Sequence, residues 1–272
     1  MTTNFEQVYY ENPALWVPER FGSLVTERIN LALEWMPSEV NSVLDIGCGN
    51  GVFVNHLYSK ASFLSVVGTD RSFAALQKVR SNRGQVDIAS LPFRDHGFDF
   101  VVSMEVIEHL PYHLYKQSLT EIVRVAKNYI LITVPYKENR SFKQVACPEC
   151  GCIFHPDYHS RSFTEQDMQD LFKDWACIMP IKIQGIVAVK EFMFPGLWKM
   201  VRRAYLRGRD FPMRALCPQC GYSENSSAAN VAVATHTSGH VDKRINWKVT
   251  TRSLWPKKTT RCWWMALYRK EH

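Results

Sequence analysis

Short apolar runs alternate along this chain with stretches whose apolar residues recur at helical spacing. The runs predict buried strands, and the spaced pattern predicts helices that pack on them. Seven strands are predicted, at Val43–Asp45, Phe63–Asp70, Val86–Ala89, Phe98–Ser103, Tyr129–Val134, Cys177–Ile186 and Cys262–Tyr268. Helices are predicted at Glu19–Met36, Val52–Ser59, Tyr112–Lys127, from a Ser72 cap to Val79, and after a capping box at Thr164–Asp167.

This alternation sets the fold class. Strands separated by helices imply an α/β fold, with a doubly wound, mostly parallel, Rossmann-like sheet covered on both faces. Ligands of such sheets bind beyond the carboxyl ends of the strands. The sheet domain is predicted at residues 41–190 and 262–272, after a helical lead-in at 1–40 and around an insertion at 191–261. The aromatic start of the lead-in, with Tyr10 and Trp16, is predicted to be irregular and either to fold over a ligand or to pack on the surface.

Composition and net charge exclude few classes of function. The chain has 272 residues, 46% hydrophobic content and a net charge of +7, which fits an anionic partner as well as many enzymes without one. No apolar run approaches the roughly 18 residues of a membrane span, and the first residues lack a secretory pattern. We therefore expect a cytoplasmic protein, in which paired cysteines are more often metal ligands than disulfides.

The first strand leads into the run V-L-D-I-G-C-G-N-G, which predicts a cofactor site. Gly47, Gly49 and Gly51 favour a tight turn with bare backbone facing a ligand. Asp70 ends the second strand about 25 residues after Asp45, the spacing at which a βαβ unit presents an acid to a ribose. A nicotinamide-binding dehydrogenase is the alternative, but its G-x-G-x-x-G fingerprint is broken because Val52 follows Gly51.

These residues resemble the class I S-adenosylmethionine-dependent methyltransferases, of the type 11 and 23 kind, over Val43–Lys190 and the last strand. The resemblance implies methyl transfer, a seven-stranded methyltransferase sheet and S-adenosylmethionine as cofactor. It places the methionine part against Asp45 and the three glycines, the ribose hydroxyls on Asp70, and the adenine at Asp87, Ile88 and Ala89. It also puts Cys48, Arg71 and Met104 at the cofactor.

The segment M-E-V-I-E-H-L-P after the fourth strand bears on the methyl acceptor. It lacks the N-P-P-Y motif of enzymes that methylate amino groups of nucleic acids and the P-C dipeptide of pyrimidine C5 enzymes. A hydroxyl acceptor needs its proton removed, and Glu108 and His109 are suitably placed for this step. The sequence therefore favours O-methylation of a small-molecule hydroxyl.

A metal-dependent variant of this chemistry is also open. The E-x-x-E-H arrangement of Glu105, Glu108 and His109 resembles that of ubiquinone-pathway O-methyltransferases and of enzymes that methylate the terminal 2′-hydroxyl of small RNAs. His159 stands where the latter have a further histidine, so a divalent cation such as magnesium is one hypothesis. In the other, His109 is a metal-free base and the glutamates cap the helix or touch the cofactor.

Two C-P-x-C pairs predict a structural zinc site. Cys147, Cys150, Cys217 and Cys220 supply four thiolates, and zinc would join the loops that follow the fifth and sixth predicted strands into one lid. Cys152, His155 and His159 remain alternative ligands. A non-catalytic, zinc-stabilised module that binds S-adenosylmethionine is a further alternative, although the intact cofactor motif argues against it.

The segment Phe192–Arg214 interleaves aromatic and basic residues. This pattern is typical of an RNA-binding surface, an acidic membrane surface or a phosphate site, but also of a solvated helix. A small molecule is the expected partner, and RNA is the alternative.

Overall fold

The structure is a computed structural model that describes residues 5–16, 23–60, 64–172, 175–177, 182–190, 211–212, 215–223 and 257–270. The chain divides into two compact units, one of Met1–Ser141, Tyr158–Gly185 and Arg261–His272, the other of Phe142–Asp157 and Ile186–Thr260. Each unit has a hydrophobic core of its own. The domain boundaries given above stay a prediction.

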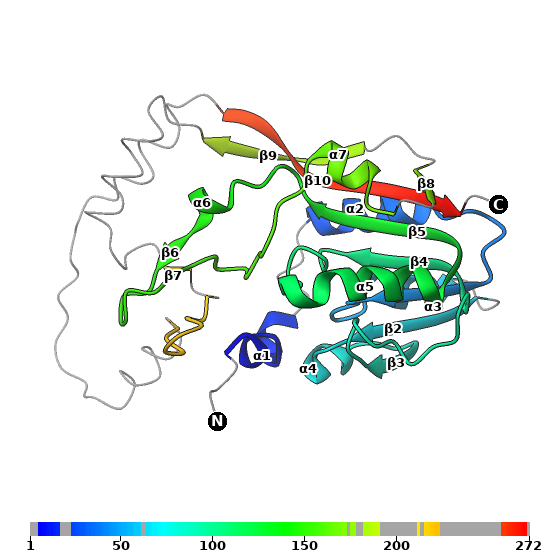
Figure 1. The fold of residues 1–272 in the computed structure, drawn as a ribbon, viewed down its shortest axis with the longest axis horizontal. Coiled ribbons are helices and arrows are strands. Elements are labelled where there is room, and N and C mark those ends of the chain that lie inside the picture. Colours follow the sequence, from blue (N-terminus) through cyan, green and yellow to red (C-terminus); the bar gives the residue numbers. More distant parts are fainter. Residues whose placement is uncertain are drawn as a thin grey trace. The chain divides into compact units, whose positions relative to one another are not determined.

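The first unit is built on the main sheet (Figure 1). Within the described residues the sheet has eight strands in the order β3-β2-β1-β4-β5-β10-β8, with β9 paired to β10. Strands β3, β2, β1, β4 and β5 run parallel to one another, whereas β10 is antiparallel to its neighbours β5 and β8. The strands are β1 Ser42–Ile46, β2 Ser65–Asp70, β3 Asn82–Gln85, β4 Phe98–Met104, β5 Ala126–Pro135, β8 Trp175–Cys177, β9 Lys182–Lys190 and β10 Lys257–Lys270. The predicted fold class is confirmed.

Alternation along the strands produces two apolar layers. Val43 of β1 points to one face with Phe100 and Val102 of β4, and Leu44 points to the other with Val101. Helices α2 (Ser23–Glu34) and α3 (Val52–Lys60) cover the first face. Helices α5 (Tyr112–Val125) and α7 (Glu165–Gln169) cover the second, and Figure 1 shows α5 in front of the strands. The capping box that begins α7 forms as predicted.

Three predicted segments are corrected. The third strand is not Val86–Ala89 but Asn82–Gln85, because the Asp87 carboxylate accepts a hydrogen bond from the Ala89 N–H in a turn that ends the strand. The sixth predicted strand is two strands, β8 and β9. The start of the lead-in is not irregular, because it forms helix α1 (Phe5–Tyr10) and a 3-10 turn, η1 (Pro13–Trp16).

The second unit has a short hairpin and a small core in its described part. Strands β6 (Val145–Ala146) and β7 (Ile153–Phe154) pair antiparallel after helix α6 (Arg140–Lys143). Phe154 packs there with Phe211, Ala215 and two cysteines. The basic segment Phe192–Arg214 lies outside the described residues except for Phe211 and Pro212.

No helix in the described part of the chain is long and apolar enough to span a bilayer.

Candidate active site

The turn between β1 and α3 has the backbone that its glycines predict. Gly47, Gly49 and Gly51 have φ angles of 74°, 55° and 77°, in the region that side chains rarely adopt. The Gly47 and Cys48 N–H groups both donate to the Thr69 carbonyl, which ties the turn to the end of β2. A Cβ added at Gly47 would lie 2.3 Å from Cγ2 of Val106, so the turn also requires glycine for space.

Two buried aspartates adjoin this turn. Asp70, at the end of β2, accepts from the Gly49 and Ser72 N–H groups at 2.8 Å each. Burial raises its pKa, although these hydrogen bonds oppose the shift. At Asp45, burial followed by the charge of Asp70 raises the pKa to about 8. In the described structure Oδ1 of Asp45 has no hydrogen-bond partner.

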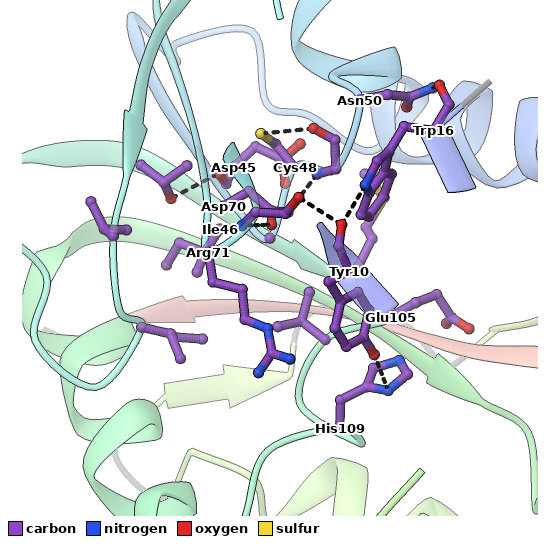
Figure 2. Close-up of a pocket in the computed structure, with 18 of the residues that line it drawn as sticks. Tyr10, Trp16, Asp45, Ile46, Cys48, Asn50, Asp70, Arg71, Glu105 and His109 are labelled. Carbon is purple, nitrogen blue, oxygen red and sulfur yellow. Dashed lines mark hydrogen bonds between the residues drawn. The ribbon is translucent and has the colours of Figure 1, made fainter. Parts of the chain in front are cut away.

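A cavity of about 630 Å³ opens at this carboxyl edge of the sheet (Figure 2). Eleven of the residues predicted at the cofactor and catalytic sites line it: Asp45, Gly47, Cys48, Gly49, Asp70, Arg71, Asp87, Ile88, Met104, Glu105 and His109. Gly51, Ala89, Glu108 and His159 are not among its lining residues. The volume is in the range that holds a cofactor-sized ligand.

The N-terminal segment, residues 5–16, forms one wall of this cavity. The Tyr10 ring lies 4.4 Å from the Arg71 guanidinium carbon, and its carbonyl accepts from Trp16 Nε1 at 2.8 Å. The Glu11 carboxylate accepts from the N–H groups of Phe73 and Ala74 at the start of helix α4 (Phe73–Leu76). The structure shows this segment against the cavity, and whether it covers a bound cofactor stays a prediction.

The loop from β4 into α5 carries three of the four predicted catalytic residues, Glu105, Glu108 and His109. Glu105, with a φ of 61°, pairs with Arg28 at 3.4 Å. Glu108 is fully buried, and neither of its carboxylate oxygens has a hydrogen-bond partner within the described ranges. Burial, followed by the charge of Glu105, raises the pKa of Glu108 well above its usual range. His109 Nε2 lies 3.9 Å from Glu108 Oε1.

His159 completes a three-residue group with this loop. One polar atom each from Glu108, His109 and His159 lies within 4.8 Å of the others, and the two imidazole centroids are 4.6 Å apart. Glu105 is not part of this group. The buried Glu138 carboxylate binds Nδ1 of His159. Glu138, Tyr10 and Arg28 were not predicted from sequence as site residues.

The family is decided by comparison with known sequences. A family profile described as "Methyltransferase domain" matches residues 18–175, which is more than half of the chain. The chain belongs to this family. It is an S-adenosylmethionine-dependent methyltransferase, and the dehydrogenase alternative is excluded.

Two curated relatives and one solved structure are similar to the methyltransferase. An uncharacterized protein of Methanocaldococcus jannaschii is 30% identical over 180 residues, which cover 61% of this chain and 76% of that protein. A malonyl-[acyl-carrier protein] O-methyltransferase of Legionella pneumophila is 33% identical over 102 residues, 34% of each chain. The YcgJ protein of Bacillus subtilis shares the fold, with a TM-score of 0.52 at 16% identity over 91% of this chain and 99% of its own.

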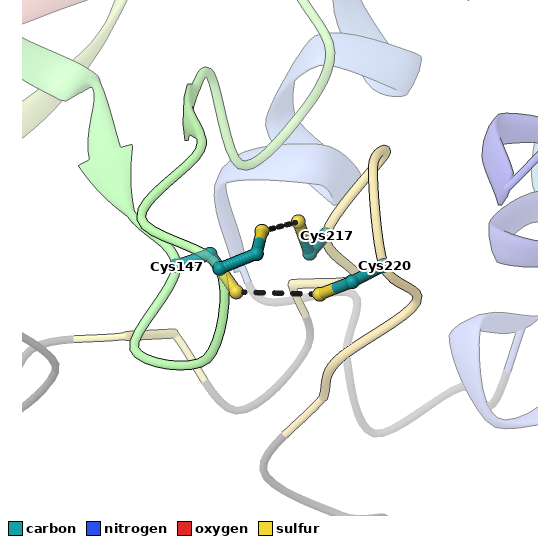
Figure 3. A group of neighbouring side chains, drawn as sticks. Cys147, Cys217 and Cys220 are labelled. Atoms are coloured by element: carbon teal, nitrogen blue, oxygen red, sulfur yellow. Dashed lines mark hydrogen bonds between the residues drawn. The ribbon is translucent and has the colours of Figure 1, made fainter.

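The second unit of the methyltransferase brings the four predicted cysteines together (Figure 3). Sγ–Sγ distances are 3.6 Å for Cys147–Cys220 and for Cys150–Cys217. Sulfurs placed tetrahedrally about zinc, at about 2.3 Å from the metal, are about 3.8 Å apart, so the group fits that ion. The group of four includes neither Cys152 nor His155, and His159 lies with Glu108 and His109 in the other unit.

The two cysteine turns have the same backbone. The Cys147 N–H donates to the Cys152 carbonyl and the Cys217 N–H to the Tyr222 carbonyl. Gly151 and Gly221 follow the second cysteine of each turn with φ angles of 72° and 74°. Cys152 thus stands where the other turn has Tyr222.

Gly47→Ala tests the turn directly. We expect a free energy of unfolding lower by roughly 1–3 kcal/mol, because a left-handed φ and the contact with Val106 both oppose a side chain. We also expect weaker binding of S-adenosylhomocysteine. Chemical denaturation and calorimetry measure the two effects. Gly84→Ala is the control, because a Cβ there meets only Val86 at 3.6 Å, and an equal loss in both variants would contradict the assignment.

Asp45→Asn tests the buried aspartate through pH. The folded-state pKa of about 8 exceeds that of an unfolded aspartate, so the native state binds more protons between about pH 4 and 8. Stability of the cofactor-free protein therefore falls as pH rises through this window. The asparagine variant should lack this decline and exceed the wild type near pH 8 by a few kcal/mol, on the order of 1.4 kcal/mol per pKa unit. Urea unfolding at several pH values measures the free energy of unfolding of both proteins. If it changes with pH in the same way in wild type and variant, the raised pKa of Asp45 is refuted.

Proposed function

We propose that this methyltransferase transfers the methyl group of S-adenosylmethionine to a hydroxyl of a small molecule. The observation that carries the proposal is the group of Glu108, His109 and His159, because His109 lines the cavity beside the glycine turn. The similarity to the Legionella O-methyltransferase, which covers a third of that protein, supports oxygen as the acceptor atom.

The cofactor is proposed to lie along the carboxyl edge of β1, β2 and β3. The glycine turn would hold its methionine part, and Asp87 with Ile88 its adenine. The Asp70 carboxylate accepts backbone N–H groups of its own turn, and since two carboxylate oxygens offer about four lone-pair sites, it can still accept from ribose hydroxyls. Gly51 and Ala89, which do not line the cavity, would act through the backbone shape of their turns.

The group at the β4–α5 loop would handle the acceptor proton. When bound, S-adenosylmethionine supplies an electrophilic methyl group on a sulfonium. His109 would take the proton of the acceptor hydroxyl as the methyl–sulfur bond breaks and S-adenosylhomocysteine leaves, a role worth about 10²–10⁴-fold in rate. Glu108, 3.9 Å from His109 Nε2, is placed to stabilise the charge that this imidazole gains.

A second candidate is methylation of an RNA 2′-hydroxyl with a divalent cation. Glu108 favours it, because a fully buried carboxyl group without a hydrogen-bond partner in the described residues, beside two imidazoles, is a candidate metal ligand. One carboxylate and two imidazoles suit a transition ion better than magnesium, which prefers oxygen. The fourth residue of the predicted set, Glu105, instead pairs with Arg28.

Label transfer separates the two candidates. The protein is incubated with [methyl-³H]S-adenosylmethionine and either a small-molecule extract or total small RNA, with and without EDTA. Label in the small-molecule fraction that survives EDTA supports the main proposal. Label in RNA that EDTA abolishes supports the second candidate, and label in neither fraction contradicts both.

We further propose that Cys147, Cys150, Cys217 and Cys220 bind a structural zinc ion. Four thiol groups at tetrahedral spacing in two matching turns support a closed site without an open coordination position.

A further inference from the structure

The two imidazoles of the candidate catalytic group are each held through the same ring nitrogen. Nδ1 of His109 lies 3.1 Å from the Tyr10 hydroxyl, a hydrogen bond visible in Figure 2. Nδ1 of His159 is bound by the Glu138 carboxylate. Tyr10 and Glu138 are far in sequence from the histidines that they contact. Each imidazole is therefore held by a residue from another segment of the chain.

The opposite ring nitrogen of His109 faces the centre of the group. Nε2 of His109 is the atom 3.9 Å from the buried Glu108 carboxylate. His159, whose Nδ1 binds Glu138, contributes one ring nitrogen to the same group. A partner on one ring nitrogen sets the orientation of the other nitrogen, and a carboxylate partner, which only accepts, also selects the tautomer.

Tyr10 is firmly placed by contacts other than the one to His109. Its ring lies under the Arg71 guanidinium, and its carbonyl accepts from the Ser72 hydroxyl at 2.8 Å. The next residue, Glu11, binds two N–H groups at the start of α4. The hydroxyl therefore reaches His109 from a wall of the cavity that is anchored independently.

Glu138 is placed by the loop after β5. It is buried, and it follows Lys137, whose φ of 40° is a strained conformation for a residue with a side chain. Tyr136 forms an isolated bridge with Phe163, which ties this loop to the segment that carries His159. The backbones of these two segments thus hold the Glu138 carboxylate next to the His159 imidazole.

We propose that Tyr10 and Glu138 are positioning residues: Tyr10 directs Nε2 of His109 toward Glu108, and Glu138 fixes the imidazole of His159 beside that pair. The proposal rests on the proposed function, since it concerns the same group. It assigns the N-terminal segment a part in the reaction as well as in covering the cofactor cavity. The orientation of His109 is then linked to the placement of residues 5–16 over that cavity.

The test needs no methyl acceptor. The full-length protein, labelled with ¹⁵N at histidine and saturated with S-adenosylhomocysteine, is compared by NMR with Tyr10→Phe and Glu138→Gln. His109→Ala and His159→Ala identify the two sets of ring signals. Tyr10→Phe should change the Nδ1 and Nε2 signals of His109, and Glu138→Gln should shift those of His159 toward a mixture of tautomers.

Matched controls alter a tyrosine–glutamate pair elsewhere. The Tyr129 hydroxyl donates to Glu39, and neither residue contacts an imidazole of the group, so Tyr129→Phe and Glu39→Gln should leave both sets of signals unchanged. Unchanged His109 signals in Tyr10→Phe, or unchanged His159 signals in Glu138→Gln, would overturn the assignment of that residue.

A kinetic readout keeps this proposal separate from the proposed function. Each variant should lower kcat by about 10–100-fold, as loss of an orienting partner does elsewhere, with the KM for S-adenosylmethionine unchanged. If His109→Ala retains full transfer, the proposed function fails, while the NMR shifts still decide the orientation. If Tyr10→Phe retains full methyl transfer while His109→Ala has lost it, the positioning role of Tyr10 is overturned. The proposed function is unaffected by that result.

Discussion

His109→Ala is expected to lower kcat for methyl transfer by about 10²–10⁴-fold, because it removes the proposed general base. The affinity for S-adenosylhomocysteine should change little, since the glycine turn and Asp70 at the proposed cofactor site are unaltered. Transfer of tritium from S-adenosylmethionine measures the rate, and calorimetry measures the affinity. The two readouts together distinguish a catalytic defect from loss of the fold.

His113→Ala is the matched control for this variant. His113 is an exposed histidine of α5, four residues further along the chain, and is not among the residues lining the cavity. Its replacement should preserve both rate and affinity. A His109→Ala enzyme as active as His113→Ala would remove His109 from the chemistry.

Removal of zinc is expected to unfold the second unit. Metal analysis of freshly purified protein should give one zinc ion per chain. Structural zinc contributes apparent binding free energies of about 10–16 kcal/mol at neutral pH, far more than a small apolar core supplies. A chelator or Cys217→Ser should therefore abolish the hydrogen-exchange protection around Cys147 and Phe154.

Cys152→Ser supplies the control for the zinc prediction. Cys152 occupies the place of Tyr222 in the matching turn, so this variant should retain the metal and the protection. Protein that contains no zinc, or a Cys152→Ser variant that loses zinc as Cys217→Ser does, would contradict the ligand set.

The central strands were predictable because they are buried on both faces. Such strands require nearly continuous apolar runs, and β1, β4 and β5 have them. Strand β3 lies at the sheet edge and consists of the polar run N-R-G-Q, so no apolar pattern marks it. The nearby apolar residues Val86 and Ile88 instead line the cavity.

The cofactor turn was predictable for a local reason, and much of the candidate site was not. The need for glycine at a positive φ arises within one short segment, so the local sequence reveals it. All three glycines of the turn have a positive φ. Tyr10 and Glu138 enter the site through contacts across 99 and 21 positions of sequence, which no local pattern encodes. The density of aromatic residues before Pro18 was the only sequence signal of the cavity wall.

The atom that receives the methyl group tests the central claim most directly. The enzyme is supplied with S-adenosylmethionine carrying a CD₃ methyl group and a small-molecule extract, and the labelled products are identified by mass spectrometry and NMR. We predict CD₃ on oxygen, with no product formed by His109→Ala. Label on nitrogen or carbon of the products, or oxygen labelling that persists in His109→Ala, would contradict the proposed role of this site.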